Sequence, residues 1–459
     1  MKVKDMSQDE RVRYMTTAPI PGLISQMAIP TIISMLVTSF YNMADTLFVG
    51  RINTQSTAAV GVSFSVMALI QATGFFFGHG SGNYISRQLG AREYEDAERM
   101  SATGFISAVI AGIILGVIGI IFIDPISVGL GSTPTILPYT RAYLRIIFMG
   151  APFIMGSFVL NNQMRFQGSA SLAMVGIVSG AMLNIVLDPI FIFGLDMGVA
   201  GAALATVISQ FVSFCILLYM DITKAAIKVN IKNFTPNAHY YGNMFRGGIP
   251  SLCRQGIGSI STIILNTAAG NYGGAMADAA IAAMGVVSRI SMFANSALIG
   301  FGQGFQPVCG TNYGAGRYTR VREAFIFCVK VGTLVLFGLS VAGFVYAGNL
   351  VELFRDDPDV IAVGTLALRA QCITFTLNAW IIMCNMMLQT VGMAFKASVV
   401  AIARQGLFLI PALLILPKLF GLFGVQTAQT VSDLCSFILA VPMAVSVLKN
   451  FKEDRKDGI

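Results

Sequence analysis

Uninterrupted apolar segments recur along this 459-residue chain, and no other feature of the sequence restricts its fold so strongly. An α-helix of about 20 apolar residues is long enough to cross the hydrocarbon core of a bilayer. Charged residues make up only 11% of the chain, whereas soluble domains carry about 25%. The sequence therefore predicts an all-α integral membrane protein.

We predict twelve membrane spans in two sets of six. The polar stretch TKAAIKVNIKNFTPNAHYY (223–241) separates the two sets. The predicted boundaries are 1–222 for an N-terminal lobe, 223–242 for a cytoplasmic linker and 243–459 for a C-terminal lobe with a cytoplasmic tail. The spans are expected near 20–49, 56–80, 99–123, 139–160, 168–194, 199–221, 243–270, 279–305, 323–347, 361–389, 395–418 and 424–448.

The two halves resemble each other in sequence at a constant offset of 224 residues. Residues 78–94 read GHGSGNYISRQLGAREY, and residues 302–318 read GQGFQPVCGTNYGAGRY. An even number of spans in each half gives the two repeats parallel topology, with their symmetry axis along the membrane normal. Folds of this kind rock two bundles against each other around a central site, which indicates transport. The positions that match are Gly78, Gly80, Gly90, Ala91 and Tyr94 with Gly302, Gly304, Gly314, Ala315 and Tyr318.

Lysine and arginine collect in alternate predicted loops. The segments between these loops, 124–138, Asp196 and 352–359, are poor in basic residues. The positive-inside rule therefore predicts a multi-pass protein of the cell membrane with both termini in the cytoplasm. Because the basic residues are scattered among short loops, the sequence does not indicate nucleic-acid binding. The basic segments are 2–13, 87–99, 224–246, 317–322 and 449–456.

Two acidic residues, Asp45 and Asp188, lie inside predicted spans. A carboxylate at mid-membrane costs about 2.5–3.5 kcal/mol on insertion scales, so such residues usually mark an ion or proton path. Asn184 precedes Asp188 by one helical turn, and Asn42 and Tyr41 precede Asp45. Spans one and five both run outward, which predicts a shared site for H⁺ or Na⁺. The alternative is that each aspartate caps a helix at the outer interface.

The second half has no acid at the position that corresponds to either aspartate. It carries instead two Arg-Gln pairs, each about ten residues into a predicted span, and one intramembrane acid in span twelve. We expect this acid to balance the charge of one arginine, or these residues to line a substrate cavity. The residues are Arg254, Gln255, Arg404, Gln405 and Asp433.

No sequence motif predicts an enzyme, a disulfide or a metal centre. The seven cysteines lie within or beside apolar segments without CxxC spacing, and they are expected to pack as small core residues. The two histidines, His79 and His239, lie far apart in the chain. We therefore expect no cofactor, and no metal ion other than Na⁺ at Asp45, Asn184 and Asp188.

Five segments carry a family resemblance: YNMADTLFVGRI (41–52), GSGNYISRQLGARE (80–93), LNIVLDPIFIFG (183–194), GFGQGFQPVCGTNYGAG (300–316) and RQGLFLIP (404–411). In these segments the chain resembles the multidrug and toxic compound extrusion (MATE) family, in its bacterial branch of DinF-like and MepA-like exporters. The resemblance covers nearly all twelve spans.

The resemblance implies a V-shaped pair of six-helix lobes that acts as a monomeric antiporter. It would export small organic compounds, mostly cations, in exchange for H⁺ or Na⁺ by alternating access. The family's acid pair with a neighbouring asparagine matches Asp45, Asn184 and Asp188. The alternative is a flippase for lipid-linked saccharide precursors, which Arg254, Arg289 and Arg404 keep open.

Overall fold

The computed structural model describes residues 6–451, and every regular element within this range is a helix. The ends of the basic segments 2–13 and 449–456, and of both predicted lobes, lie outside the described residues. The N-terminal lobe begins with a short helix whose first turn is closed by a capping box between Ser7 and Glu10. Its α-helices are α1 (Gln8–Thr17), α2 (Ile20–Gly50), α3 (Thr54–Gly90), α4 (Tyr94–Ile121), α5 (Ile123–Gly129), α6 (Leu137–Phe166), α7 (Ala170–Pro189) and α8 (Gly198–Lys224).

The C-terminal lobe follows a short 3-10 helix, η3 (Ile231–Asn233). Within residues 6–451, two π-helical segments occur: η2 (Ile190–Gly194) continues α7, and η5 (Ala403–Leu407) joins α15 to α16. The C-terminal helices are α9 (Ala238–Tyr272), η4 (Gly274–Met276), α10 (Ala277–Gly314), α11 (Tyr318–Val345), α12 (Ala347–Phe354), α13 (Pro358–Phe375), α14 (Asn378–Val391), α15 (Ala394–Ile402), α16 (Leu409–Phe420) and α17 (Leu422–Leu448).

Helix boundaries repeat between the lobes with the offset seen in the sequence. Adding 224 to the bounds of α4 gives 318–345, the bounds of α11, and adding 224 to those of α8 gives 422–448, the bounds of α17. Even the short helix α5 has a counterpart that begins 224 residues later, α12. The two lobes are therefore built from the same sequence of elements.

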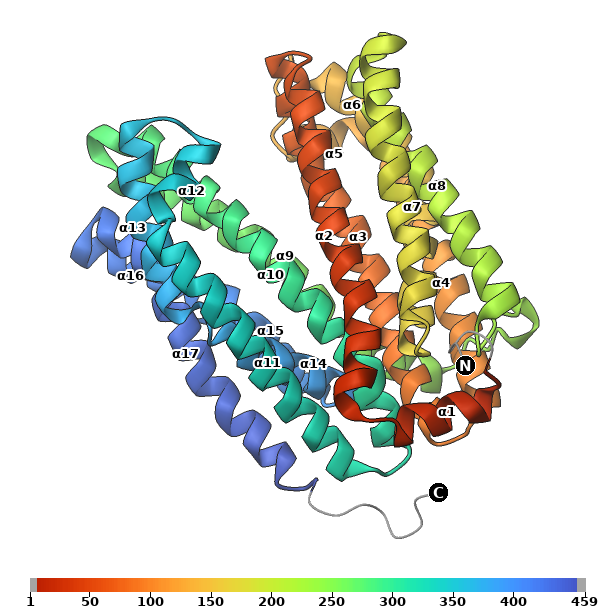
Figure 1. Cartoon of the computed structure of the whole chain (residues 1–459). Helices are drawn as coiled ribbons and strands as arrows, with labels where there is room; N and C mark the ends of the chain where they lie inside the picture. The colour runs from red at the N-terminus through yellow and green to blue at the C-terminus, as the bar shows by residue number, and fades with distance from the viewer. Residues whose placement is uncertain (1–5, 452–459) are drawn as a thin grey trace.

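The two lobes form a V (Figure 1). They meet at the end of the molecule where α1 and the last turn of α17 lie, and they diverge toward the end that carries α5 and α12 (Figure 1). Helix α2 follows α10 of the other lobe: Thr31 donates to the carbonyl of Gly300 at 2.6 Å, and Ser39 donates to Ser296 at 2.9 Å. The Phe40 and Phe293 rings contact each other one residue further along, with centroids 5.4 Å apart.

Ten helices within residues 6–451 are long and apolar enough to cross a membrane, and the bent pair α13 and α14 makes eleven. Helix α9 is long enough for a twelfth span but is not among them, because residues such as Arg254 and Gln255 make it less apolar. The predicted span 361–389 is not one straight helix, since α13 and α14 meet at 56°.

Some predicted boundaries differ from the helices. The expected linker, 223–242, narrows to residues 225–237, because Asn237 caps α9 by accepting a hydrogen bond from the backbone of Tyr240. Spans expected at 56–80 and 279–305 extend to Gly90 and Gly314, so the glycine-rich repeated motif is helical.

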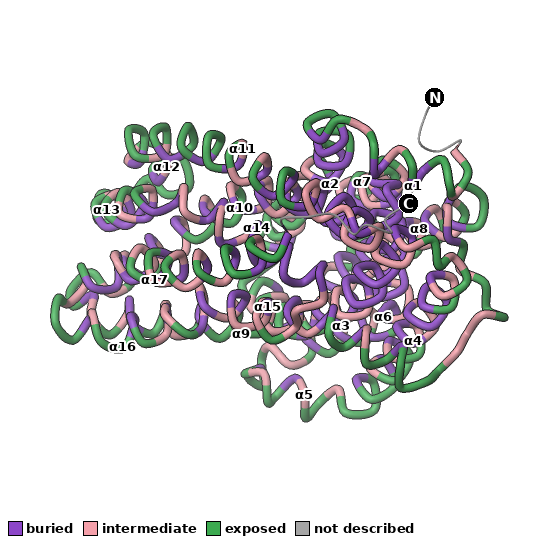
Figure 2. Tube along the Cα trace, turned by 90° about the horizontal axis from the view of Figure 1, so that it is seen from below, coloured by how far each residue is buried: buried purple, intermediate pink, exposed green. Residues whose placement is uncertain are grey.

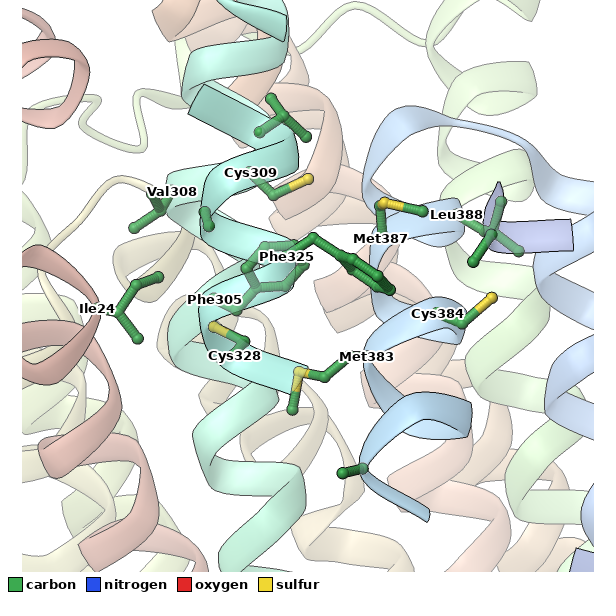
Figure 3. Packing of buried hydrophobic residues seen from close by; sticks show 14 of the residues in the cluster. Ile24, Phe305, Val308, Cys309, Phe325, Cys328, Met383, Cys384, Met387 and Leu388 are labelled. Atoms are coloured by element: carbon green, nitrogen blue, oxygen red, sulfur yellow. The ribbon is translucent and has the colours of Figure 1, made fainter. Parts of the chain in front are cut away.

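Buried side chains occupy the interior of each bundle and the junction between them. The outer faces of α5, α11 and α16 carry many exposed residues (Figure 2). One large core cluster joins the lobes: Ile24 of α2 lies beside Val308 of α10, and Phe305 and Phe325 face the methionines of α14 (Figure 3). Cys309, Cys328 and Cys384 belong to this core, as expected for small apolar residues.

Glycines allow the backbones of the two lobes to touch at the closed end of the V. A Cβ atom on Gly90 would overlap the carbonyl oxygen of Thr311, and one on Gly314 would overlap that of Arg87. Gly80 lies against the carbonyl of Met244 in the same way. The repeated motif therefore supplies a mutual glycine contact between α3 and α10, which explains why Gly90 and Gly314 correspond.

We expect the Gly90→Ala substitution to destabilise the closed end by about 1–3 kcal/mol, the usual penalty for overpacking. The measurement is the melting temperature of the purified full chain. Gly61→Ala on the same helix is the control, because nothing lies within 4 Å of a Cβ at Gly61. A melting temperature that changes equally in the two variants would contradict the proposed contact.

Candidate ion-coupling site

Asp188 and Asn184 lie on one face of α7, deep in the N-terminal lobe. Their exposed fractions are 0% and 1%. Residues four apart on a helix are neighbours, and Asn184 Nδ2 donates to Asp188 Oδ1 at 3.4 Å. The same amide donates to Thr206 Oγ1 of α8, also at 3.4 Å. Both hydrogen bonds are long, so the group is only loosely held together.

Asp45 reaches the same group from α2. Asp45 lies one helical turn after Tyr41, which lines the same cavity as Asn184, so the Asp45 carboxylate lies near Asp188. The Tyr143 side chain of α6 is near both acids. Three buried oxygens of this group have no hydrogen-bond partner among the described residues: Asp45 Oδ1, Asp188 Oδ2 and Asn184 Oδ1. Buried acceptors of this kind are costly unless a hydrogen-bond donor, a proton or a cation satisfies them.

A cavity of about 40 Å³ borders the group, which is enough for a water molecule. Its walls come from α2, α3, α6, α7 and α8, so the site belongs to one lobe and does not lie between the two. The cavity is lined by Thr38, Tyr41, Gln71, Phe158, Ile177, Gly180, Ala181, Asn184, Thr206, Ser209, Gln210 and Ser213.

The chain leaves the α-helical pattern after Pro189, the residue that follows Asp188. Pro189 lacks a backbone N–H, and the next five residues, Ile190–Gly194, form a π-helix. Single π-helical turns inside longer helices often occur at functional sites. The acid therefore sits where the helix geometry changes.

Four of the five predicted coupling residues come together in the structure: Tyr41, Asp45, Asn184 and Asp188. The fifth, Asn42, is exposed, because adjacent residues of a helix point about 100° apart. Sequence reasoning missed Tyr143, Thr206 and Gln210, and the last of these lines the same cavity as Tyr41. Gln210 was detectable as a lone amide in an apolar span, whereas nothing in the sequence distinguishes Tyr143 or Thr206.

The polar residues predicted in the C-terminal lobe form separate contacts. Arg404 Nε donates to Asp433 Oδ1 at 2.8 Å, and Gln429 donates to the same oxygen at 2.8 Å. Gln405 contributes its backbone carbonyl to a hydrogen bond from Ser261. Arg254 donates to Asn385 Oδ1 at 3.4 Å. Gln255 is half-buried. Asp433 thus faces Arg404, and Arg254 lies apart from this ion pair.

Two pseudo-symmetric helical bundles that span the membrane, with an acid site buried in one of them, define a membrane transporter rather than an enzyme. The MatE family profile matches residues 30–190 and 250–414. The chain belongs to the multidrug and toxic compound extrusion family, and this confirms the predicted all-α fold class.

Curated relatives cover nearly the whole chain. The chain is 30% identical over 451 residues to the multidrug export protein MepA of Staphylococcus haemolyticus, which covers 98% of each protein. It is 31% identical over 449 residues to MepA of Staphylococcus aureus strain MSSA476, with 96% of this chain and 97% of that protein covered. These comparisons give no support to the flippase alternative.

Solved structures of MATE family and MOP superfamily transporters superpose closely on this fold. A multidrug resistance MATE family transporter of the MOP superfamily, described in an outward-facing conformation, superposes with a TM-score of 0.91 at 27% identity. A MOP superfamily transporter from Pyrococcus furiosus, for which a reverse polarity of the binding pocket is described, gives 0.90 at 26% identity. Each comparison covers 96% of this chain and 98% of the other.

Proposed function

We propose that this protein exports small organic compounds, mostly cations, in exchange for H⁺ or Na⁺, and that Asp45, Asn184 and Asp188 bind the coupling ion. The observation that carries the proposal is the set of three buried, unpartnered oxygens on these residues. Oxygen acceptors suit either a proton or a hard cation such as Na⁺. The names of the staphylococcal relatives, multidrug export proteins, support the export of drugs.

The transport cycle follows from the V shape. The positive-inside rule places the closed end, which carries Arg87, Arg92 and Arg317, in the cytoplasm. In the described arrangement the lobes then diverge toward the exterior. The acid site takes up an external ion in this state and releases it after the lobes part at the cytoplasmic end, where the next compound binds. The protein performs this cycle as a monomer in the cell membrane.

The ion gradient supplies enough free energy for useful export. One elementary charge that moves inward across 100 mV releases about 2.3 kcal/mol. One pH unit adds about 1.36 kcal/mol per proton. Exchange of one such ion for one monovalent organic cation moves no net charge, so only the concentration gradient of the ion drives it. Since about 1.4 kcal/mol corresponds to a tenfold ratio, one pH unit sustains a tenfold export gradient of such a cation.

Proteoliposomes that contain the purified full chain test the proposal and identify the ion. Inside-out protein should accumulate ethidium when a pH gradient or a Na⁺ gradient is imposed alone at constant membrane potential, and the gradient that works names the coupling ion. Protein-free liposomes and collapsed gradients are the controls. If neither gradient drives ethidium uptake above these controls, the antiport proposal is wrong.

A further inference from the structure

The two lobes can be compared position by position in the helices that form the acid site. Adding 224 to residues 170–194, which form α7 and η2, gives 394–418, the stretch occupied by α15, η5 and α16. Helix α8 corresponds in the same way to α17. The glycine two residues before each of the first two segments, Gly168 or Gly392, has a left-handed backbone, with φ of 82° and 91°. The acid site of the N-terminal lobe therefore has a definable counterpart in the C-terminal lobe.

Small residues that line the acid-site cavity are replaced in this counterpart by larger polar ones. Gly180, Ala181 and Ser209 line the cavity on α7 and α8. At the same offset the C-terminal lobe carries an arginine, a glutamine and an aspartate, on η5 and α17. A basic and an acidic side chain thus stand at positions that border an open space in the other lobe. The corresponding residues are Arg404, Gln405 and Asp433.

The contact of Gln405 with α9 supports this correspondence from a third helix. A Cβ atom on Gly258 of α9 would lie 2.8 Å from Gln405 Oε1, so the glutamine side chain lies against this helix. Pro30 of α2 and Pro250 of α9 align the two helices at an offset of 220 residues. Gly258 is then the counterpart of Thr38, which lines the cavity in the N-terminal lobe. The C-terminal lobe therefore places an amide side chain against the wall that corresponds to the cavity wall.

Arg404 and Asp433 form an ion pair at this place. Arg404 Nε donates to Asp433 Oδ1 at 2.8 Å, and the aspartate is fully buried. Asp433 Oδ2 and Thr430 Oγ1 are also buried, and they have no hydrogen-bond partner among the described residues. Thr430 corresponds to Thr206, the hydroxyl that Asn184 contacts in the acid site. Both lobes therefore hold a buried aspartate and a threonine hydroxyl here, and the C-terminal lobe adds a positively charged side chain.

We propose that the guanidinium group of Arg404 is a tethered cation, which stands in the C-terminal lobe where the coupling ion binds in the N-terminal lobe. A guanidinium group stays protonated in proteins and cannot leave, so the charge at this place is constant through the transport cycle. Only the acid site of the N-terminal lobe then exchanges an ion. Without the arginine, Asp433 and Thr430 offer oxygen ligands to Na⁺. This inference rests on the proposed function, because it takes the acid site as the ion site.

Replacing Arg404 by alanine removes the tethered charge and tests the proposal, with sodium as the probe. Melting temperatures of the purified full chain are measured in sodium chloride and in choline chloride at equal ionic strength. Arg404→Ala should melt below the wild type in choline chloride, because Asp433 has lost its partner. Sodium chloride should raise the melting temperature of this variant, because an ion that binds only the folded state stabilises it. Arg404→Gln, which keeps most of the side-chain volume, is the second variant if Arg404→Ala does not fold.

Two matched controls separate Asp433 from the acid site. Arg404→Lys keeps a tethered cation, and Arg404→Ala combined with Asp433→Asn removes the acid. All of these variants keep Asp45 and Asp188, so sodium that binds at the acid site raises every melting temperature equally. A larger sodium response in Arg404→Ala than in both controls supports the proposal, and an equal response in Arg404→Ala and Arg404→Lys overturns it. Since only differences between variants count, a failure of the acid site to bind sodium is distinguishable from a failure of the tethered cation.

Discussion

Replacing Asp188 by asparagine is expected to reduce gradient-driven ethidium transport about tenfold or more, to the level of protein-free liposomes. An amide has nearly the shape of a carboxylate but neither takes up a proton nor offers a negative charge to Na⁺. Hydrogen bonds to charged groups contribute about 1.5–3 kcal/mol, which corresponds to a loss in ion affinity of more than tenfold. Asp45→Asn should have the same consequence, because the two carboxylates interact.

The measurement is ethidium transport in proteoliposomes at matched protein content. Asp278→Asn is the control: Asp278 is an exposed acid in the first turn of α10, and it undergoes the same chemical change outside the site. Because Asp188 is unpartnered at Oδ2, its neutralisation should leave the melting temperature unchanged or higher. Full transport activity in the Asp188→Asn protein would show that the coupling ion binds elsewhere.

Arg404→Gln is expected to cost about 3–5 kcal/mol of stability, because it leaves Asp433 buried without its ion-pair partner. The side chains of Arg404 and Asp433 are 14% and 0% exposed. The double replacement Arg404→Leu with Asp433→Leu should recover most of the loss, since an apolar pair leaves no unpaired charge. Melting temperatures of the purified proteins measure both effects.

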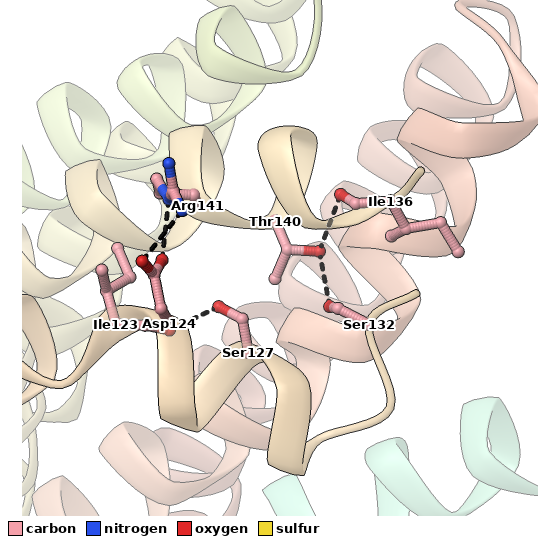
Figure 4. A network of polar contacts seen from close by, with 7 residues as sticks. All are labelled: Ile123, Asp124, Ser127, Ser132, Ile136, Thr140 and Arg141. Carbon is pink, nitrogen blue, oxygen red and sulfur yellow. Dashed lines mark hydrogen bonds and ion pairs between the residues drawn. The ribbon is translucent and has the colours of Figure 1, made fainter. Parts of the chain in front are cut away.

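The surface ion pair between Arg141 and Asp124 is the control for this prediction. Arg141 donates to both carboxylate oxygens, at 2.7 and 2.9 Å, and both side chains are about half exposed (Figure 4). An exposed pair contributes only about 0–1 kcal/mol, so Arg141→Gln should scarcely change the melting temperature. If Arg404→Gln is as mild as Arg141→Gln, the buried pair does not hold α17 against the π-helical segment η5.

The sequence predicted the fold class because its strongest signals are local or repeated. Apolar runs defined the spans, and the 224-residue offset between glycine motifs predicted two similar lobes. The acid site was predictable for an energetic reason: an aspartate inside an apolar span is expensive and therefore rare. Asp45 and Asp188 stood out on that ground alone.

Features that depend on tertiary contacts were not predictable. Neither proline nor glycine occurs where α13 and α14 meet, so the 56° bend has no local signal. Asn42 lies apart from the buried group, because neighbouring residues of a helix point in different directions and a list of polar neighbours ignores this. Arg165 was overlooked because it lies in a helix end that reads as a basic boundary, whereas in the fold its side chain is only 2% exposed.

The packing of α2 against α10 joins the two lobes and can serve as the pivot between them. The last of these contacts, between Phe40 and Phe293, lies only five residues before Asp45, or about 7.5 Å along the helix. Helix α2 extends only ten residues, or about 15 Å, beyond Phe40, so Asp45 lies midway between this point and the open end of the helix at Gly50. If the ion binds at Asp45 as proposed above, a shift at the acid site is expected to be about doubled at the open end of α2.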